Sequence, residues 1–201
     1  MLSKSQPINV LAGARFFLFG ARDVWFVVAL PVFLASQLHW DNWHVGSFLA
    51  LWVIGYGVVQ TLAPKLTQTS RKPAHRQAQW WGAFLTLSPL MLAAALYFGW
   101  PVAQSIMIGL AIFGVLFAIN SSLHSYLIVS YARAEGVSLD VGFYYMANAA
   151  GRLTGTILSG WVYQAQGLLA CLLISAGLLL LSTLTIRLLP SREHTPGSVT
   201  H

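Results

Sequence analysis

Apolar stretches long enough to cross a membrane recur along almost the whole chain, and this feature restricts the fold more than any other. A helix needs about 20 apolar residues to cross the roughly 30 Å hydrocarbon core of a bilayer. Of the 201 residues, 57% are hydrophobic and only 8% are charged, which is too few charged side chains to cover a water-soluble globule. We therefore expect a single all-α membrane domain over residues 1–201, and not a soluble enzyme.

Six transmembrane helices joined by short connections account for these stretches. Their predicted limits are 8–38, 45–64, 80–100, 101–131, 140–164 and 167–189. The first and fourth exceed the length of one crossing, so they should tilt or project into the cytoplasm. Pro31 and Pro89 are sites where a kink would be tolerated, because neighbouring helices can satisfy the freed carbonyls. The single cysteine, Cys171, has no partner for a disulfide and is expected to be a buried apolar residue.

The connections between the spans alternate in whether they carry basic residues. None occurs in residues 39–44, at the Trp100/Pro101 corner or at the Ala165/Gln166 corner. They flank the other span ends instead: Lys4, Lys65, Arg71, Lys72, Arg76, Arg133, Arg187 and Arg192. The positive-inside rule then places both termini in the cytoplasm, with the chain in the cell inner membrane. The formal charge of +6 is mostly a topology signal, and we expect the lipid bilayer, and no nucleic acid, as a partner.

Charged residues also lie inside two of the predicted spans. The first span contains Arg15, Arg22 and Asp23, and the fifth contains Arg152. A charge at the centre of a spanning helix costs about 2.5–3.5 kcal/mol on insertion scales, so these side chains should face protein or a water-filled cavity. Arg15 and Arg22 are nearly two helical turns apart and should point the same way.

Small residues recur in the same two spans. Gly13 and Gly20 repeat the arginine spacing on roughly the opposite face of the first span. In the fifth span small residues recur every four positions, and they are Ala147, Gly151, Gly155 and Ser159. Such strips let the backbones of two membrane helices approach closely. We expect Gly13, Gly20, Gly151 and Gly155 to be packing residues.

The surplus of arginines over acids inside the spans predicts an anionic ligand. Three guanidinium groups face one carboxylate, and an unpaired buried charge costs several kcal/mol. We expect a water-accessible cavity in which guanidinium groups hold phosphate-like or carboxylate oxygens. Polar residues of the fourth and fifth spans complete the predicted substrate site, which consists of Arg15, Arg22, Arg152, Asn148, Asn120, His124 and Tyr144.

Other interpretations of these residues stay open. Arg22 or Arg152 could simply neutralise Asp23, which is either a counter-ion or a proton carrier. His124 is either a satisfied core residue or a group that couples protons or contacts substrate. A hydrolase built on Ser122 and His124 is disfavoured, because residues two apart on a helix do not face each other. We expect no catalytic site, metal or cofactor, and the sequence lacks a nucleotide-binding signature.

Six spans with both ends inside, together with the fifth-span motif NAAGRLTGTILSGWVYQ, resemble the C-terminal half of a major facilitator superfamily transporter. The segments NVLAGARFFLFGARDVWFVVALPVFL and HVGSFLALWVIGYGVVQTLAP are similar to organoarsenical efflux permeases of the ArsJ type. That resemblance implies export of 1-arseno-3-phosphoglycerate, which a companion glyceraldehyde-3-phosphate dehydrogenase makes from arsenate. The loop LAPKLTQTSRKPAHRQ departs from the superfamily pattern, since it lacks the usual acidic residue and paired glycines.

Transporters of this kind have twelve spans in two halves, with the substrate between the halves. The resemblance therefore implies that this chain is truncated, or that it pairs with a polypeptide supplying an N-terminal six-helix half. Two other functions remain in view. One is proton-coupled efflux of other small organic molecules, and the second is a membrane scaffold that transports nothing.

Overall fold

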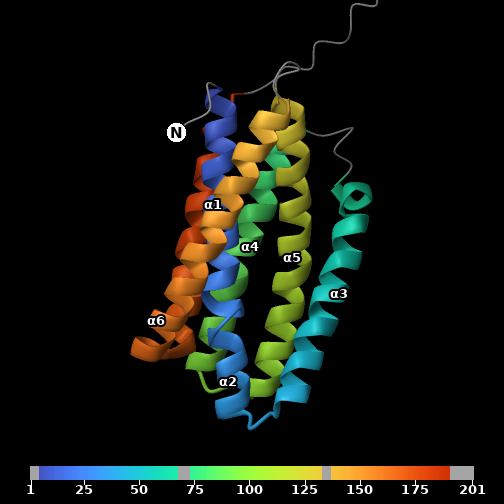
Figure 1. The fold of residues 1–201 in the computed structure, drawn as a ribbon. Helices are drawn as coiled ribbons and strands as arrows, with labels where there is room; N and C mark the ends of the chain where they lie inside the picture. The colour runs from blue at the N-terminus through green and yellow to red at the C-terminus, as the bar shows by residue number, and fades with distance from the viewer. Residues whose placement is uncertain (1–4, 68–72, 133–136, 191–201) are drawn as a thin grey trace, which may run out of the picture.

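The computed structural model describes residues 5–67, 73–132 and 137–190, and every regular element in this part of the chain is helical. The helices form an antiparallel bundle (Figure 1). Their bounds are α1 Gln6–Phe26, α2 Ala29–Gln37, α3 Asn42–Thr67, α4 Ala74–Tyr97, α5 Val102–Tyr131 and α6 Val137–Ile186. The basic residues Lys4, Arg71, Lys72, Arg133 and Arg192, used above for orientation, lie outside the described residues.

These helices provide six candidate membrane crossings, because one of the five spanning segments folds back on itself. Five segments are long and apolar enough to span a bilayer, and the first of them joins α1 to α2. The last, α6, is 50 residues long and folds back at Gly167, whose φ of 76° lies in the left-handed region that favours glycine. Figure 1 shows α6 descending along the bundle and returning beside α1. The predicted all-α membrane fold is confirmed.

The helix limits differ from the expected ones by up to three residues at most ends, and two differences are larger. The first span breaks at Val27 and Val28, because Pro31 has no amide to bond the Val27 carbonyl and its ring crowds that oxygen. Pro89, by contrast, lies within an α4 that remains one helix. α4 also begins six residues before the expected position 80, since the polar residues after Pro73 continue the helix beyond the apolar stretch.

α1 and the first half of α6 pack backbone against backbone. A Cβ at Gly151 would overlap the Phe16 carbonyl oxygen, and one at Gly155 would lie 2.6 Å from the Gly20 oxygen. Only glycine permits this approach, because any side chain would occupy the position of the facing backbone. Gly13 is different, since a Cβ there would meet only the Thr185 methyl group at 3.8 Å, which is an ordinary contact.

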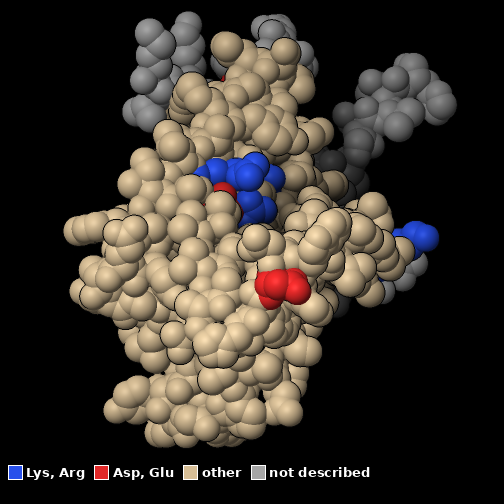
Figure 2. Space-filling model, turned by 60° about the horizontal axis from the view of Figure 1, so that its bottom comes forward, with Lys and Arg blue, Asp and Glu red and all other residues tan. Residues whose placement is uncertain are grey.

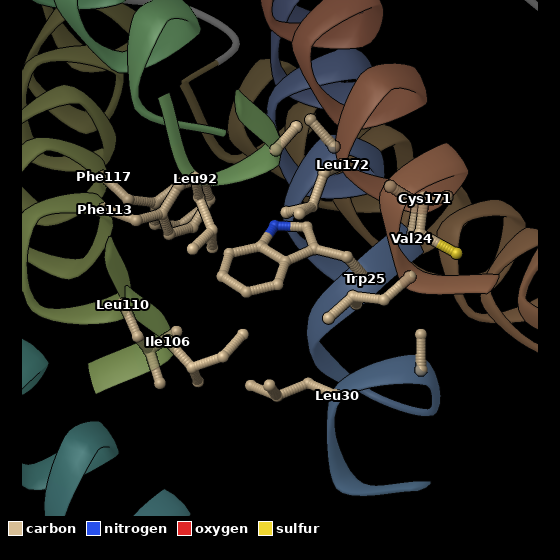
Figure 3. Packing of buried hydrophobic residues seen from close by; sticks show 14 of the residues in the cluster. Val24, Trp25, Leu30, Leu92, Ile106, Leu110, Phe113, Phe117, Cys171 and Leu172 are labelled. Atoms are coloured by element: carbon tan, nitrogen blue, oxygen red, sulfur yellow. The ribbon is translucent and has the colours of Figure 1, made fainter. Parts of the chain in front are cut away.

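The apolar core is centred on the fully buried Trp25 of α1. Figure 3 shows its indole surrounded by residues of α2, α4, α5 and the returning part of α6. The Phe113 ring meets the indole edge to face, with a centroid distance of 5.1 Å. This packing fixes the lower part of α1 against four other helical segments.

α3 is the most weakly attached helix, and Trp52 anchors it. The Trp52 indole nitrogen donates a hydrogen bond of 2.8 Å to the Leu110 carbonyl oxygen of α5. The ring fits over Gly114, where an added Cβ would lie 2.8 Å from the indole nitrogen. Most of the remaining α3 side chains are exposed. In Figure 1, α3 stands at the side of the bundle next to α5.

The α1–α6 contact predicts the effect of adding one methyl group. Gly151→Ala should destabilise the fold by about 1–3 kcal/mol, the usual cost of overpacking, because the methyl group would overlap the Phe16 carbonyl. Gly160→Ala in the same helix is the control, since nothing lies within 4 Å of its added Cβ. The unfolding midpoint of each purified variant in lipid nanodiscs measures the effect. Equal midpoints for the two variants would contradict the packing.

Candidate functional site

A buried carboxylate joins two arginines from different helices. Asp23 Oδ1 lies 2.6 Å from Arg22 Nε within α1, and Asp23 Oδ2 lies 3.1 Å from Arg152 Nε of α6. The Asp23 side chain is 1% exposed, that of Arg22 is 14% exposed and that of Arg152 is 55% exposed. The ion-paired cluster Arg22–Asp23–Arg152 therefore has a closed side formed by α1 and an open side formed by Arg152.

The glycine strip brings these charges together. A Cβ at Gly155 would lie 3.0 Å from Asp23 Cβ and 2.6 Å from the Gly20 oxygen. Arg152 precedes Gly155 by three residues, so it lies on the same side of α6, almost one turn away. The small residues that allow close helix packing thus also set the reach of Arg152 to the carboxylate.

Arg15 is sealed inside the bundle and has no carboxylate partner among the described residues. Its side chain is 4% exposed. One guanidinium nitrogen donates to the Ser121 carbonyl and to the Ser121 hydroxyl, both at 3.2 Å. The guanidinium carbon lies 4.1 Å from the Phe19 ring centre and 5.0 Å from that of Tyr144. Its Nε has no hydrogen-bond partner in the described structure. Neutral dipoles and aromatic faces, and no opposite charge, surround this cation.

Positive charge exceeds negative charge at this site. The described structure gives Arg22, Arg152 and Arg15 one carboxylate, and Arg22 and Arg152 share it. The other buried acid of the described residues, Asp140, lies in the first turn of α6, twelve residues before Arg152. Figure 2 shows basic side chains gathered around an acidic group on a surface that otherwise carries few charges. Such an arrangement attracts anions from its open side.

The remaining predicted site residues are divided between the cluster and the core. His124 is 1% exposed and interacts electrostatically with Arg15. Its ring nitrogen Nδ1 has no hydrogen-bond partner in the described structure. Asn120 lies toward α4, where its amide nitrogen would be 3.4 Å from a Cβ at Gly82. Tyr144 is fully buried against Arg15, and Asn148 lies one turn from Arg152 and is partly exposed. The structure therefore groups Arg15 with His124 and Tyr144, and directs Asn120 elsewhere.

A comparison with protein-family models shows the family of the chain. The model described as Major Facilitator Superfamily matches residues 11–201. The chain belongs to the major facilitator superfamily. This is a family of transporters. A comparison with curated protein sequences finds no match for the chain.

Two features of this superfamily member escaped the sequence analysis. Phe19 lies between two cations, with its ring centre 4.1 Å from the Arg15 guanidinium carbon and 5.0 Å from that of Arg22. Ser121 supplies both acceptors for Arg15. Helical spacing could have indicated Phe19, which is four residues after Arg15 and three before Arg22. Nothing in the sequence selects Ser121 among the serines of α5.

The ion-paired cluster predicts strong energetic coupling between its members. Asp23→Asn should destabilise the protein by about 3–5 kcal/mol, because the nearly buried Arg22 loses its counter-charge. Adding Arg22→Gln to that variant should recover part of the loss. Adding Arg152→Gln should recover less, because more than half of the Arg152 side chain is exposed and its charge depends less on Asp23. A double-mutant cycle on the free energy of unfolding measures both couplings. Additive effects in both cycles would contradict the shared carboxylate.

Proposed function

We propose that this chain is one half of a secondary active transporter that exports an anionic, phosphorylated organoarsenical such as 1-arseno-3-phosphoglycerate. The observation that carries this proposal is the shortage of carboxylate at the Arg22–Asp23–Arg152 cluster. Two guanidinium groups share one acid there, so neither is fully neutralised. Guanidinium forks suit the tetrahedral oxygens of phosphate and arsenate.

Each charged residue has a separate part in this proposal. Arg152 makes the first contact with the anion, because more than half of its side chain is exposed. Arg22 and Asn148 form the inner wall, and Asp23 holds both arginines in place when no substrate is bound. Arg15 is enclosed, so it raises the local positive potential without touching bulk solvent.

The exposed faces support a requirement for a second half. Additional Cβ atoms at Gly46, Gly55 and Gly57 of α3, and at Gly142 and Gly160 of α6, would meet nothing within 4 Å. Glycines on a membrane-facing surface allow another helix to approach closely. We expect an N-terminal six-helix half to cover α3 and the first part of α6. The two halves together would then enclose the cluster in a cavity between them. Both termini are proposed to lie in the cytoplasm, with the chain in the cell inner membrane.

Proton-coupled efflux of other small organic molecules is the second candidate. The bridging position of Asp23 favours it, because one proton on that carboxylate would release two arginines together. Transport measured against pH in the complete transporter separates the candidates. An unchanged pH dependence in Asp23→Asn would exclude Asp23 as the proton carrier, and transport of cationic compounds would argue against the anion site. If the chain is a scaffold that transports nothing, anions should not change its unfolding midpoint.

The anion proposal predicts selective stabilisation by ligands. Arsenate and 3-phosphoglycerate should each raise the unfolding midpoint of the chain in nanodiscs, and uncharged glycerol at the same ionic strength should not. Arg152→Gln should weaken the affinity about ten- to a hundredfold, because one charge-assisted hydrogen bond contributes about 1.5–3 kcal/mol.

Arg76→Gln is the matched control for this experiment. Arg76 is an exposed arginine near the start of α4, outside the cluster. The control should keep the full response to both anions. Equal responses to glycerol and to the anions, or equal losses in the two arginine variants, would overturn the proposed site.

A further inference from the structure

A groove between α4 and α5 lies outside the charged cluster. It has a volume of about 290 Å³ and is lined by residues within 88–95 of α4, the Trp100 corner and residues within 101–112 of α5. Its walls are mostly apolar, and no Lys, Arg, Asp or Glu is among the described residues that line it. Met91 is 67% exposed, Ile108 is 61% exposed and Ile112 is 47% exposed, so the groove opens to the outside of the bundle.

The length of the groove matches one leaflet of a bilayer. Residues 101–112 of α5 rise by roughly 16 Å along the helix, at about 1.5 Å per residue. The hydrocarbon core is about 30 Å thick, so the groove reaches from the α4–α5 corner to near the midplane. Both walls are candidate membrane spans, so hydrocarbon is the medium expected at an outward-facing groove of these helices.

The two ends of the groove differ in chemistry. Trp100, Gln104 and Ser105 are at the corner end, where an indole and an amide can meet polar lipid groups. Leu92 closes the floor of the groove and packs directly on Gly109. A Cβ added at Gly109 would lie 2.9 Å from Leu92 Cδ1. The polar entrance and the apolar channel follow the order of groups in a phospholipid, from its ester region to its acyl chain.

We propose that this groove binds one acyl chain of a phospholipid, with the ester region at Trp100 and Gln104. The leaflet is the one at the α4–α5 corner, which is the end of the bundle opposite the start of α1. Because no charged side chain lines the groove, it selects the chain and not the headgroup. The proposal rests on the membrane location of α4 and α5, and it is independent of the substrate proposed above.

Photo-crosslinking of the protein in nanodiscs tests this site. The probe is a phospholipid with a diazirine in one acyl chain, and the labelled residues are mapped by mass spectrometry. Met91, Ile108 and Ile112 should be labelled several-fold more than Leu180 and Leu181 of α6, which are 50% and 46% exposed but lie outside the groove. Equal labelling of the two sets would overturn the proposal. Crosslinks from the groove to another polypeptide in place of lipid would overturn it as well.

Filling the groove provides a matched pair of variants. Ala95→Phe places a ring in the groove and should remove most of the labelling at Ile108, whereas Ala94→Phe on the adjacent exposed position should leave it unchanged. If Ala95→Phe fails to fold, Ser105→Leu on the facing wall replaces it. Undiminished labelling in the folded groove variant would contradict the site. Phosphatidylglycerol probes, which are anionic, and phosphatidylethanolamine probes, which are zwitterionic, should label the groove equally. A strong preference for phosphatidylglycerol would contradict binding through the acyl chain alone.

Discussion

A carboxylate buried between two guanidinium groups is the interaction on which this structure depends. Asp23 pairs with Arg22 of its own helix and with Arg152 of α6, and only 1% of the aspartate side chain is exposed. Ions at this depth are tolerated only when they are paired and enclosed by protein, because hydrocarbon cannot solvate them. The contact requires α1 and α6 to meet backbone to backbone, which Gly20, Gly151 and Gly155 permit. Packing and charge placement are therefore one arrangement in this bundle.

The same arrangement leaves an excess of positive charge, and the proposed transport of an anion by this major facilitator superfamily member rests on that excess. Arg15 increases the surplus from inside the bundle, where the Ser121 oxygens and the rings of Phe19 and Tyr144 stabilise it without neutralising it. The exposed side chain of Arg152 makes the cluster accessible from one side. A site of this form can exchange an internal counter-ion for an external anion. The proposed lipid groove lies between α4 and α5, away from the cluster, and would bind the surrounding bilayer and not the substrate.

Length, hydropathy and glycine spacing predicted much of this fold from the sequence, because membrane thickness fixes helix length and close packing requires small residues. The helix break lies at Val27 and Val28 and not at Pro31 itself, because a proline removes the hydrogen bond to the carbonyl four residues before it. Helical spacing placed Arg15 and Arg22 on one side of α1, but it could not show that Arg15 is sealed. That depends on Ser121 and Tyr144, which lie more than a hundred residues away along the chain. Asn120 was assigned to the site, and its amide nitrogen lies toward Gly82 of α4, a contact between helices that helical spacing alone does not predict.

The distance between a bound phosphate and the guanidinium nitrogens tests the central claim most directly. Solid-state NMR on the chain in nanodiscs can measure the dipolar coupling between the phosphorus of 3-phosphoglycerate and nitrogen-15 in arginine side chains. We predict coupling at hydrogen-bonding distance that is reduced in Arg152→Gln and unchanged in Arg76→Gln. Bound phosphate without coupling to any arginine, or coupling that survives in Arg152→Gln and is lost in Arg76→Gln, would contradict the anion site at Asp23.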